Sequence, residues 1–116
     1  MHQHHKVNYI EMPSRDLNLS KAFFTKVFGW AFVDYGPEYC AFSNGGIDGG
    51  FYYADLAISS QSSAPLIILY SNQLETTQTA VLAAGGELIK TIFSFPGGRR
   101  FQFKDPAGNE FAVWSE

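Results

Sequence analysis

The side chains best suited to chemistry in this 116-residue chain are a carboxylate and an arginine. Glu11 is the carboxylate expected to point inward from the first predicted strand, where burial beside Tyr9 and Trp114 would raise its pKa and suit a general base. Arg100 could then stabilise a developing oxyanion. The structural alternative is that Glu11 pairs with Arg100 or accepts backbone hydrogen bonds, because buried acids usually have partners.

Histidines and the single cysteine are the other candidates. His2, His4 and His5 look like a metal-binding cluster, but they precede the first strand and nothing in the sequence anchors them. Fraying, with adventitious nickel or zinc binding, is the simpler interpretation. His5 could still approach a binding cup, since it alternates with later residues onto one strand face. Cys40 lies in an apolar run without a partner cysteine, which favours a buried structural thiol.

Composition argues against several classes of function. The chain is 46% hydrophobic, enough for a continuous core, and its net charge of -3 provides no basic stripe for nucleic acid. No apolar stretch approaches the roughly 20 residues that span a bilayer, and no secretory signal pattern is present, so a soluble, cytoplasmic protein is expected. Gly45–Gly46 and Gly49–Gly50 lack the strand-to-helix context of phosphate and dinucleotide motifs, so nucleotide cofactors are not implied.

Two similar halves are expected to position the candidate residues. In the first half, periodicity and turn signals predict a strand, a helix and three further strands. The strands are expected at 7–12, 31–35, 39–43 and 50–54. The helix should begin after an N-cap at Ser14 or Asp16. It should end at Gly29, because a helix commonly ends at a residue with a left-handed backbone conformation, which glycine adopts readily.

The second half repeats this order after a polar, serine-rich connector. Its helix is expected from Leu74 to the glycines at 85–86, and its strands at 66–70, 87–92, 100–104 and 111–114. Adding 57 to a first-half number aligns Leu17 with Leu74 and Gly29 with Gly86, as two copies of one folding unit require.

The predicted fold class is therefore α+β. Residues 1–116 are expected to form a single domain of two tandem β-α-β-β-β modules that make a curved, eight-stranded cup. The expected bounds are about 6–55 for module 1, 56–64 for the connector and about 65–116 for module 2.

The stretch from Asp105 to Asn109 predicts a structural hairpin turn, because each of its residue types has a turn function. If Lys104 faces Glu110 across this turn, alternate residues of the two strands separate onto opposite faces. The helix-covered face would then hold Phe101, Phe103, Phe111 and Val113. The side chains that point into the cup would be Arg100, Gln102, Glu110, Ala112 and Trp114.

Four stretches of the sequence resemble the vicinal-oxygen-chelate superfamily, which includes glyoxalase, bleomycin resistance protein and extradiol dioxygenase. They are residues 8–13 followed by 16–17, residues 23–30, residues 85–86 and residues 103–114. The resemblance covers nearly the whole chain. Its most specific parts are the Phe-Gly-Trp helix end and the Asp-Pro-x-Gly-Asn hairpin, and it implies the same fold as the repeat.

The resemblance also implies where a metal would bind. Metal enzymes of this superfamily carry ligands at four inward-facing strand positions, usually His, Gln or Glu. Here Tyr9, Leu66 and Ala112 stand at three of these positions, and the fourth lies within 50–55, which contains none of those residue types. Leucine and alanine cannot coordinate a metal, and neutral tyrosine is a poor ligand near pH 7. A branch that lacks the metal ligands, without stoichiometric metal or cofactor, is therefore expected.

Two functions remain open. The first is binding of a small organic ligand in a metal-free aromatic cup, like the drug-sequestering members of the superfamily. The expected ligand-binding residues are Tyr9, Phe51, Tyr53, Arg100, Gln102 and Trp114. The second is a metal-independent lyase or isomerase that acts on a small carbonyl compound with Glu11 as general base. Superfamily members of this length usually pair, and an apolar concave face favours association, so a homodimer is expected.

Overall fold

The computed structural model describes residues 2–116 and divides them into two modules with the same order of elements. The first module contains β1 (Tyr9–Ser14), α1 (Leu17–Phe28), β2 (Ala31–Asp34), β3 (Tyr39–Ser43) and β4 (Asp48–Tyr53). A connector with the short 3-10 helix η1 (Ser60–Ser62) follows. The second module contains β5 (Ile67–Tyr70), α2 (Leu74–Ala83), β6 (Glu87–Phe95), β7 (Gly98–Lys104) and β8 (Glu110–Ser115).

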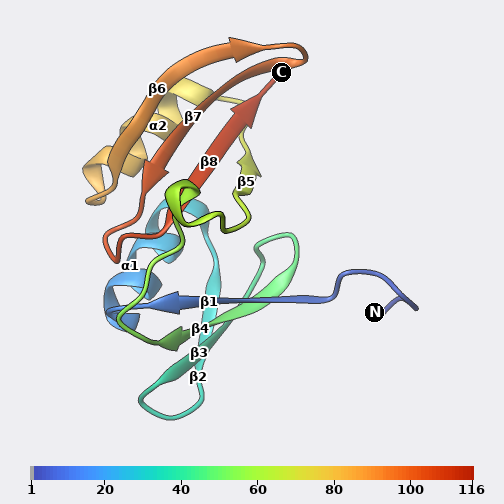
Figure 1. Cartoon of the computed structure of the whole chain (residues 1–116), viewed down its shortest axis with the longest axis vertical. Coiled ribbons are helices and arrows are strands. Elements are labelled where there is room, and N and C mark those ends of the chain that lie inside the picture. Colours follow the sequence, from blue (N-terminus) through green and yellow to red (C-terminus); the bar gives the residue numbers. More distant parts are fainter. Residues whose placement is uncertain (1) are drawn as a thin grey trace.

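Each module forms one four-stranded sheet, in the order β1-β4-β3-β2 or β5-β8-β7-β6 (Figure 1). The first strand of each module pairs in parallel with the last, and the other neighbours are antiparallel. This arrangement confirms the predicted α+β fold of two tandem β-α-β-β-β modules. The two sheets remain separate within the chain, so the eight strands do not close into one cup.

Local sequence signals set the ends of α1. The Asp16 side chain accepts a hydrogen bond from the Leu19 N–H at 3.1 Å and is therefore the N-cap. Ser14, the other candidate, instead forms a buried hydroxyl pair with Ser20 at 2.7 Å. The helix ends at Gly29, whose φ of 71° is left-handed as predicted.

One hydrophobic core lies between the sheets and includes the buried side of α1. The Phe24 ring packs against Phe51 of β4 and Phe111 of β8, with centroid distances of 5.7 and 5.0 Å. Phe23 lies 5.8 Å from Phe103 of β7, again between ring centroids. Both sheets therefore turn their helix-covered faces toward the same core. We call the opposite face of each sheet, which is turned away from this core, its exposed face. On the second sheet the connector covers part of this face, where Gln102, Glu110 and Ala112 are buried.

The strand ends differ from prediction in ways that affect the faces. β1 begins at Tyr9 rather than at residue 7 and continues through Pro13. An edge strand tolerates this proline, since β1 pairs on one side only and the missing N–H breaks no ladder. β6 continues to Phe95, three residues beyond the predicted end. Within residues 2–116, no helix is long and apolar enough to cross a membrane.

Candidate functional site

The exposed face of the first sheet carries a hydrogen-bonded cluster of Tyr9, Tyr39 and Glu11. The Tyr39 hydroxyl donates to Glu11 Oε2 at 3.0 Å, and its oxygen lies 2.5 Å from the Tyr9 hydroxyl oxygen. A hydroxyl has one proton to donate, so Tyr9 donates to Tyr39. Burial raises the pKa of the Tyr39 hydroxyl, and its hydrogen bonds to Tyr9 and Glu11 raise it further. Tyr39 therefore stays protonated at neutral pH and holds the Glu11 carboxylate.

Gly50 of β4 makes room for this cluster. A Cβ atom at this position would overlap the Tyr39 hydroxyl and would lie 2.8 Å from the Tyr9 hydroxyl oxygen. Sequence reasoning did not single out Tyr39. A glycine inside a strand often marks a close approach by another group, so Gly49–Gly50 was the available signal for such a neighbour.

The strand registers identify the fourth position of the metal-ligand set. Glu11 pairs with Gly50 in the first sheet, and Ile68, which is 57 residues later, pairs with Ala112 in the second. Gly50 therefore corresponds to Ala112. None of the four positions offers a carboxylate, an imidazole or an amide oxygen. The side chains at these four positions therefore do not fit a divalent cation. Among residues 2–116, no three His, Cys, Asp or Glu side chains are grouped to hold a metal ion.

The exposed face of the second sheet carries a chain of polar side chains that starts at Glu110. Its carboxylate accepts hydrogen bonds from the Ser60 N–H and from Gln102 Nε2, both at 2.9 Å. The Gln102 amide oxygen accepts in turn from Arg100 Nη2 at 3.3 Å. Burial alone raises the pKa of Glu110, but the hydrogen bonds from Ser60 and Gln102, together with Lys104, hold it below its usual value. Glu110 is therefore ionised at neutral pH.

Aromatic rings surround the end of this polar chain. The Arg100 guanidinium lies over the rings of Phe93 and Phe95, at 5.3 and 5.8 Å from their centroids. Trp114 packs edge-on against Tyr70, with 5.1 Å between centroids, and lies 6.5 Å from Phe95. Phe93 and Phe95 were missed by sequence reasoning because the predicted strand ended before them. This face offers flat apolar surfaces beside one cation, a combination that suits a planar organic molecule.

The predicted hairpin register on this sheet is confirmed. Lys104 pairs with Glu110 across the turn, and Arg100 pairs with Trp114. The residues that alternate with them are fully buried on the core side; they are Phe101, Phe103, Phe111 and Val113. Gln102 and Trp114 thus lie on the exposed face, as expected.

Two residues predicted to line the cup are on the wrong side of β4. Phe51 is fully buried in the core, where its ring stacks on Phe24, so it cannot contact a ligand on the exposed face. Tyr53 shares its side of the strand and lies at the strand's exposed end. Gly50 and Tyr52 occupy the exposed face instead. The predicted register was off by one residue, which reverses every side chain of a strand.

Glu11 and Arg100 lie on the exposed faces of different sheets. Glu11 is exposed and accepts its hydrogen bond from Tyr39. The part of the chain that the structure describes contains no ion pair between Glu11 and Arg100. The expected burial of Glu11 beside Trp114, and its alternative pairing with Arg100, are therefore both wrong within one chain.

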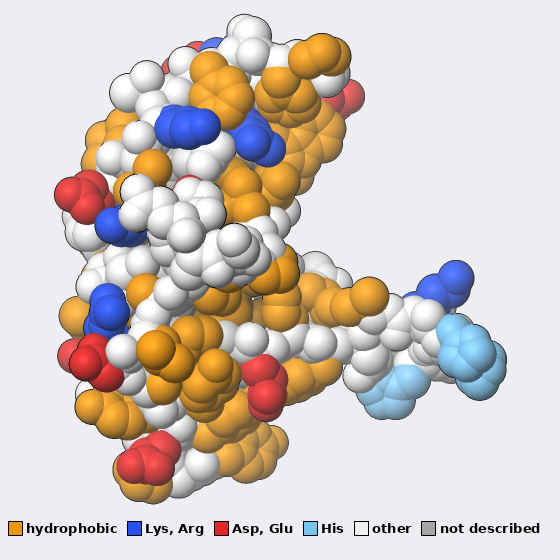
Figure 2. Space-filling model, in the orientation of Figure 1, with side chains coloured by type: hydrophobic (Ala, Val, Ile, Leu, Met, Phe, Trp, Pro, Cys, Tyr) orange, Lys and Arg blue, Asp and Glu red, His pale blue; other side chains and the backbone are white. Residues whose placement is uncertain are grey.

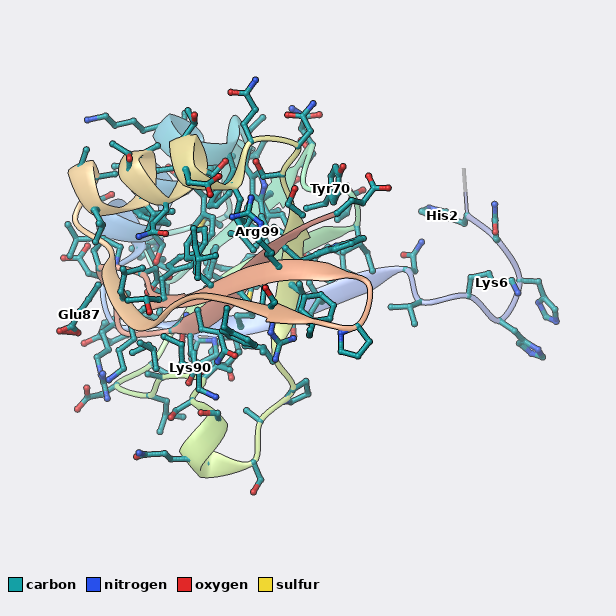
Figure 3. The ribbon with its side chains drawn as sticks, turned by 90° about the horizontal axis from the view of Figure 1, so that it is seen from above. His2, Lys6, Tyr70, Glu87, Lys90 and Arg99 are labelled. Atoms are coloured by element: carbon teal, nitrogen blue, oxygen red, sulfur yellow. The ribbon has the colours of Figure 1, made fainter. Side chains whose placement is uncertain are left out.

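The N-terminal histidines lie apart from both faces. Residues 2–8 extend away from the body of the molecule, and Figure 3 shows His2 and Lys6 on this segment. The rings of His4 and His5 stack on each other at 3.8 Å. Cys40, in contrast, is buried as predicted, and burial raises the pKa of its thiol.

A separate groove opens between the two sheets on the core side. It has a volume of about 350 Å³ and is mostly apolar. Ile10 and Met12 of β1 line one side, and Ile67 and Leu69 of β5 line the other. Figure 2 shows hydrophobic side chains around the hollow between the two lobes.

One protein-family model matches nearly the whole chain. The model of the Glyoxalase/Bleomycin resistance protein/Dioxygenase superfamily matches residues 6–113. No curated protein matches the chain. A glyoxalase-related enzyme from Fulvimarina pelagi superposes with a TM-score of 0.79 at 21% identity, over 97% of this chain and 88% of its own.

Two further solved structures have the same fold. A glyoxalase/bleomycin resistance protein/dioxygenase family enzyme from Burkholderia phytofirmans has a TM-score of 0.77 at 19% identity, with 93% of this chain and 96% of the other covered. A fosfomycin resistance protein from Listeria monocytogenes, solved with Mn(II) and a dihydroxypropylphosphonic acid, has a TM-score of 0.80 at 18% identity, over 97% and 91%. These TM-scores establish a common fold.

Proposed function

Since this chain belongs to the glyoxalase/bleomycin resistance protein/dioxygenase superfamily, we propose that it binds a small organic ligand on a metal-free aromatic surface. The observation that carries the proposal is the replacement of donors at the four ligand positions. Tyr9, Gly50, Leu66 and Ala112 offer no conventional donor, whereas aromatic rings and hydrogen-bonding groups lie on the same faces. Stacking, shape and a few polar contacts are the means by which such a surface recognises a ligand.

Metal analysis and native mass spectrometry test this function together. A form of the protein without residues 1–5 should be used, because the histidines could bind metal adventitiously. We expect no stoichiometric divalent metal and a copurified organic molecule, or saturable binding of one from a small-molecule library. About one zinc, nickel, manganese or iron per chain would contradict the proposal, since tight binding needs several protein ligands.

A second copy of the chain would complete the binding surface in this proposal. The exposed faces of the two sheets turn away from their shared core, so one chain does not join them. β1 and β5 are edge strands with one unpaired side each, and they flank the apolar groove. Tyr9, Ile68 and Tyr70 are large apolar residues of these strands with 43%, 45% and 51% of their surface exposed. Unpaired edges and apolar surface both favour association.

The proposed homodimer brings the first face of one copy against the second face of its partner. Tyr9 of one copy and Trp114 of the other would then lie around one ligand. Light scattering coupled to size exclusion at micromolar concentration is expected to give the dimer mass. A monomer mass under these conditions would contradict this arrangement.

One observation favours the alternative catalytic function. The Tyr39 hydroxyl holds the Glu11 carboxylate in place at 3.0 Å, as a general base requires. Glu11 would take a proton from the carbon beside a carbonyl group, and the electron pair of that C–H bond would move toward the carbonyl oxygen. Turnover of small carbonyl compounds that disappears in Glu11→Gln, and not in the control Asp16→Asn, would support catalysis. Tight binding without turnover would support ligand binding alone.

A further inference from the structure

A cavity of about 460 Å³ lies beside the turn that joins β6 to β7. Its lining residues are Ile68, Phe95, Pro96, Gly97, Arg100 and Trp114. All but Arg100 present apolar or backbone surface. The cavity therefore combines apolar walls with a single charged group.

Arg100 has no counter-ion in residues 2–116. Its one side-chain hydrogen bond is to the neutral amide oxygen of Gln102, and its Nε atom is buried without an acceptor in the described chain. The nearest acid of the polar chain, Glu110, already accepts hydrogen bonds at both oxygens, from Ser60 and Gln102. Because Gln102 donates to Glu110, its amide must turn its oxygen toward Arg100. Gln102 thus orients the guanidinium without neutralising it.

The neighbouring arginine shows what a paired arginine looks like in this strand. Arg99 donates to both carboxylate oxygens of Glu75 in α2, at 2.5 and 3.2 Å. Figure 3 shows Arg99 on the side of the β6–β7 ribbon that faces α2, and Lys90 on the opposite side. Alternation along the strand places Arg100 on that opposite side, where Lys90 pairs in register with Gln102.

The cations on this side have aromatic rather than acidic neighbours. Lys90 Nζ lies 5.7 Å from the centroid of the Phe93 ring, which Arg100 also covers. The Glu116 carboxylate accepts a hydrogen bond from the Tyr70 hydroxyl at 2.7 Å and is not part of the cavity lining. A half-buried, unpaired guanidinium is costly, and its planar fork matches a carboxylate.

We infer that this cavity binds a planar aromatic carboxylate, with the acid group on Arg100 and the ring against Trp114 and Phe95. This inference rests on the proposed function and narrows it to a ligand class. The ligand's carboxylate supplies the counter-ion that residues 2–116 do not provide. The rings supply the stacking surface within reach of that charge.

The test compares aromatic acids with their neutral amides. Benzoate, indoleacetate, naphthoate and the three corresponding amides are titrated into the full-length protein by calorimetry. At least one acid should bind at least about tenfold more tightly than its amide, as expected for hydrogen bonds to a charged group. Arg100→Gln should remove this preference, and Arg99→Gln, which changes the net charge equally, should retain it. Arg100→Lys keeps the charge without the fork and should retain part of the preference.

Three results would overturn the inference. Equal binding of acid and amide, unaffected by Arg100→Gln, would overturn carboxylate recognition but leave the proposed function standing. Equal losses in Arg99→Gln and Arg100→Gln would mean that only overall charge matters. If none of the acids shows saturable binding up to about 10 mM, the cavity is not a site for aromatic carboxylates. The absence of any copurified or library ligand would instead count against the proposed function itself. Thermal melting verifies that the variants fold.

Discussion

The two sheets share one strand order but expose chemically different faces. The first face holds two phenols and a carboxylate over a glycine, in the cluster of Tyr9, Tyr39 and Glu11. The second face holds a cation among aromatic rings, around Arg100 and Trp114. Core positions have to match because each sheet must accept a helix. Exposed positions carry no such requirement, so they can become two different halves of a binding surface.

The largest expected effect is the loss of stability when a core residue of the second sheet is truncated, compared with truncation of a residue on its exposed face. Phe103 is fully buried against Phe111 and Phe23, so Phe103→Ala should lower the free energy of unfolding by about 3 to 5 kcal/mol. Trp114→Ala should lower the free energy of unfolding less than Phe103→Ala does. It should weaken ligand binding more, because Trp114 lines the cavity. Chemical denaturation and ligand titration measure the two effects. Equal destabilisation by both variants would contradict the separation of the faces.

The turn between β7 and β8 should give the second module a pH-dependent stability. Burial raises the pKa of Asp105 from 3.8 to about 6, although hydrogen bonds from the backbone of Asn109, Ala107 and Gly108 oppose the rise. Between these pH values the folded state binds the proton more tightly than the unfolded state. Protonation of Asp105 thus contributes fully to the free energy of unfolding below about pH 4, and this contribution is lost as the pH rises to about 6.

Asp105→Asn isolates this contribution because asparagine does not titrate. As the pH rises from about 4 to 6, the wild type should lose up to about 3 kcal/mol of unfolding free energy relative to this variant. Urea denaturation at several pH values measures the difference. Parallel stability curves for the two proteins would show that Asp105 keeps an ordinary pKa.

Gly50→Ala is expected to disturb the first face alone. The new methyl group would overlap the Tyr39 hydroxyl and displace it from Tyr9 and Glu11, at a cost of about 1 to 3 kcal/mol. In a Tyr39→Ala background the same change should cost less, since the overlapping group is gone. Denaturation of the four proteins in this double-mutant cycle gives the coupling. If the losses of unfolding free energy are additive, the Tyr39 hydroxyl does not depend on the absence of a side chain at Gly50.

The smallest effect is expected at the exposed pair of Glu75 and Arg99. Glu75→Gln should leave the melting temperature nearly unchanged, because solvent screens an exposed ion pair. This result would contrast Arg99, which forms an exposed ion pair, with Arg100, which is predicted to matter for ligand binding. A loss of stability as large as that of Gly50→Ala would show that pairing with α2 supports the second module.

Features with local causes were predictable from the sequence. The α1 end at Gly29 follows from the need for a left-handed residue, and the 105–109 turn fixed the pairing of Lys104 with Glu110. These signals depend on neighbours within a few residues. Repetition of the same signals in both halves was enough to predict the fold, and residue identity at the four ligand positions was enough to question a metal site.

Only the tertiary structure decided which side chains share a face beyond these local signals. The strand Asp48–Tyr53 has no alternation of apolar and polar residues, so its pairing with β1 was needed to place Phe51 in the core and Gly50 under Tyr39. The isolation of Arg100 likewise depends on Glu110, whose oxygens are taken by a backbone N–H from the connector and by Gln102. Such contacts join segments far apart in the chain. No local pattern of residues encodes them.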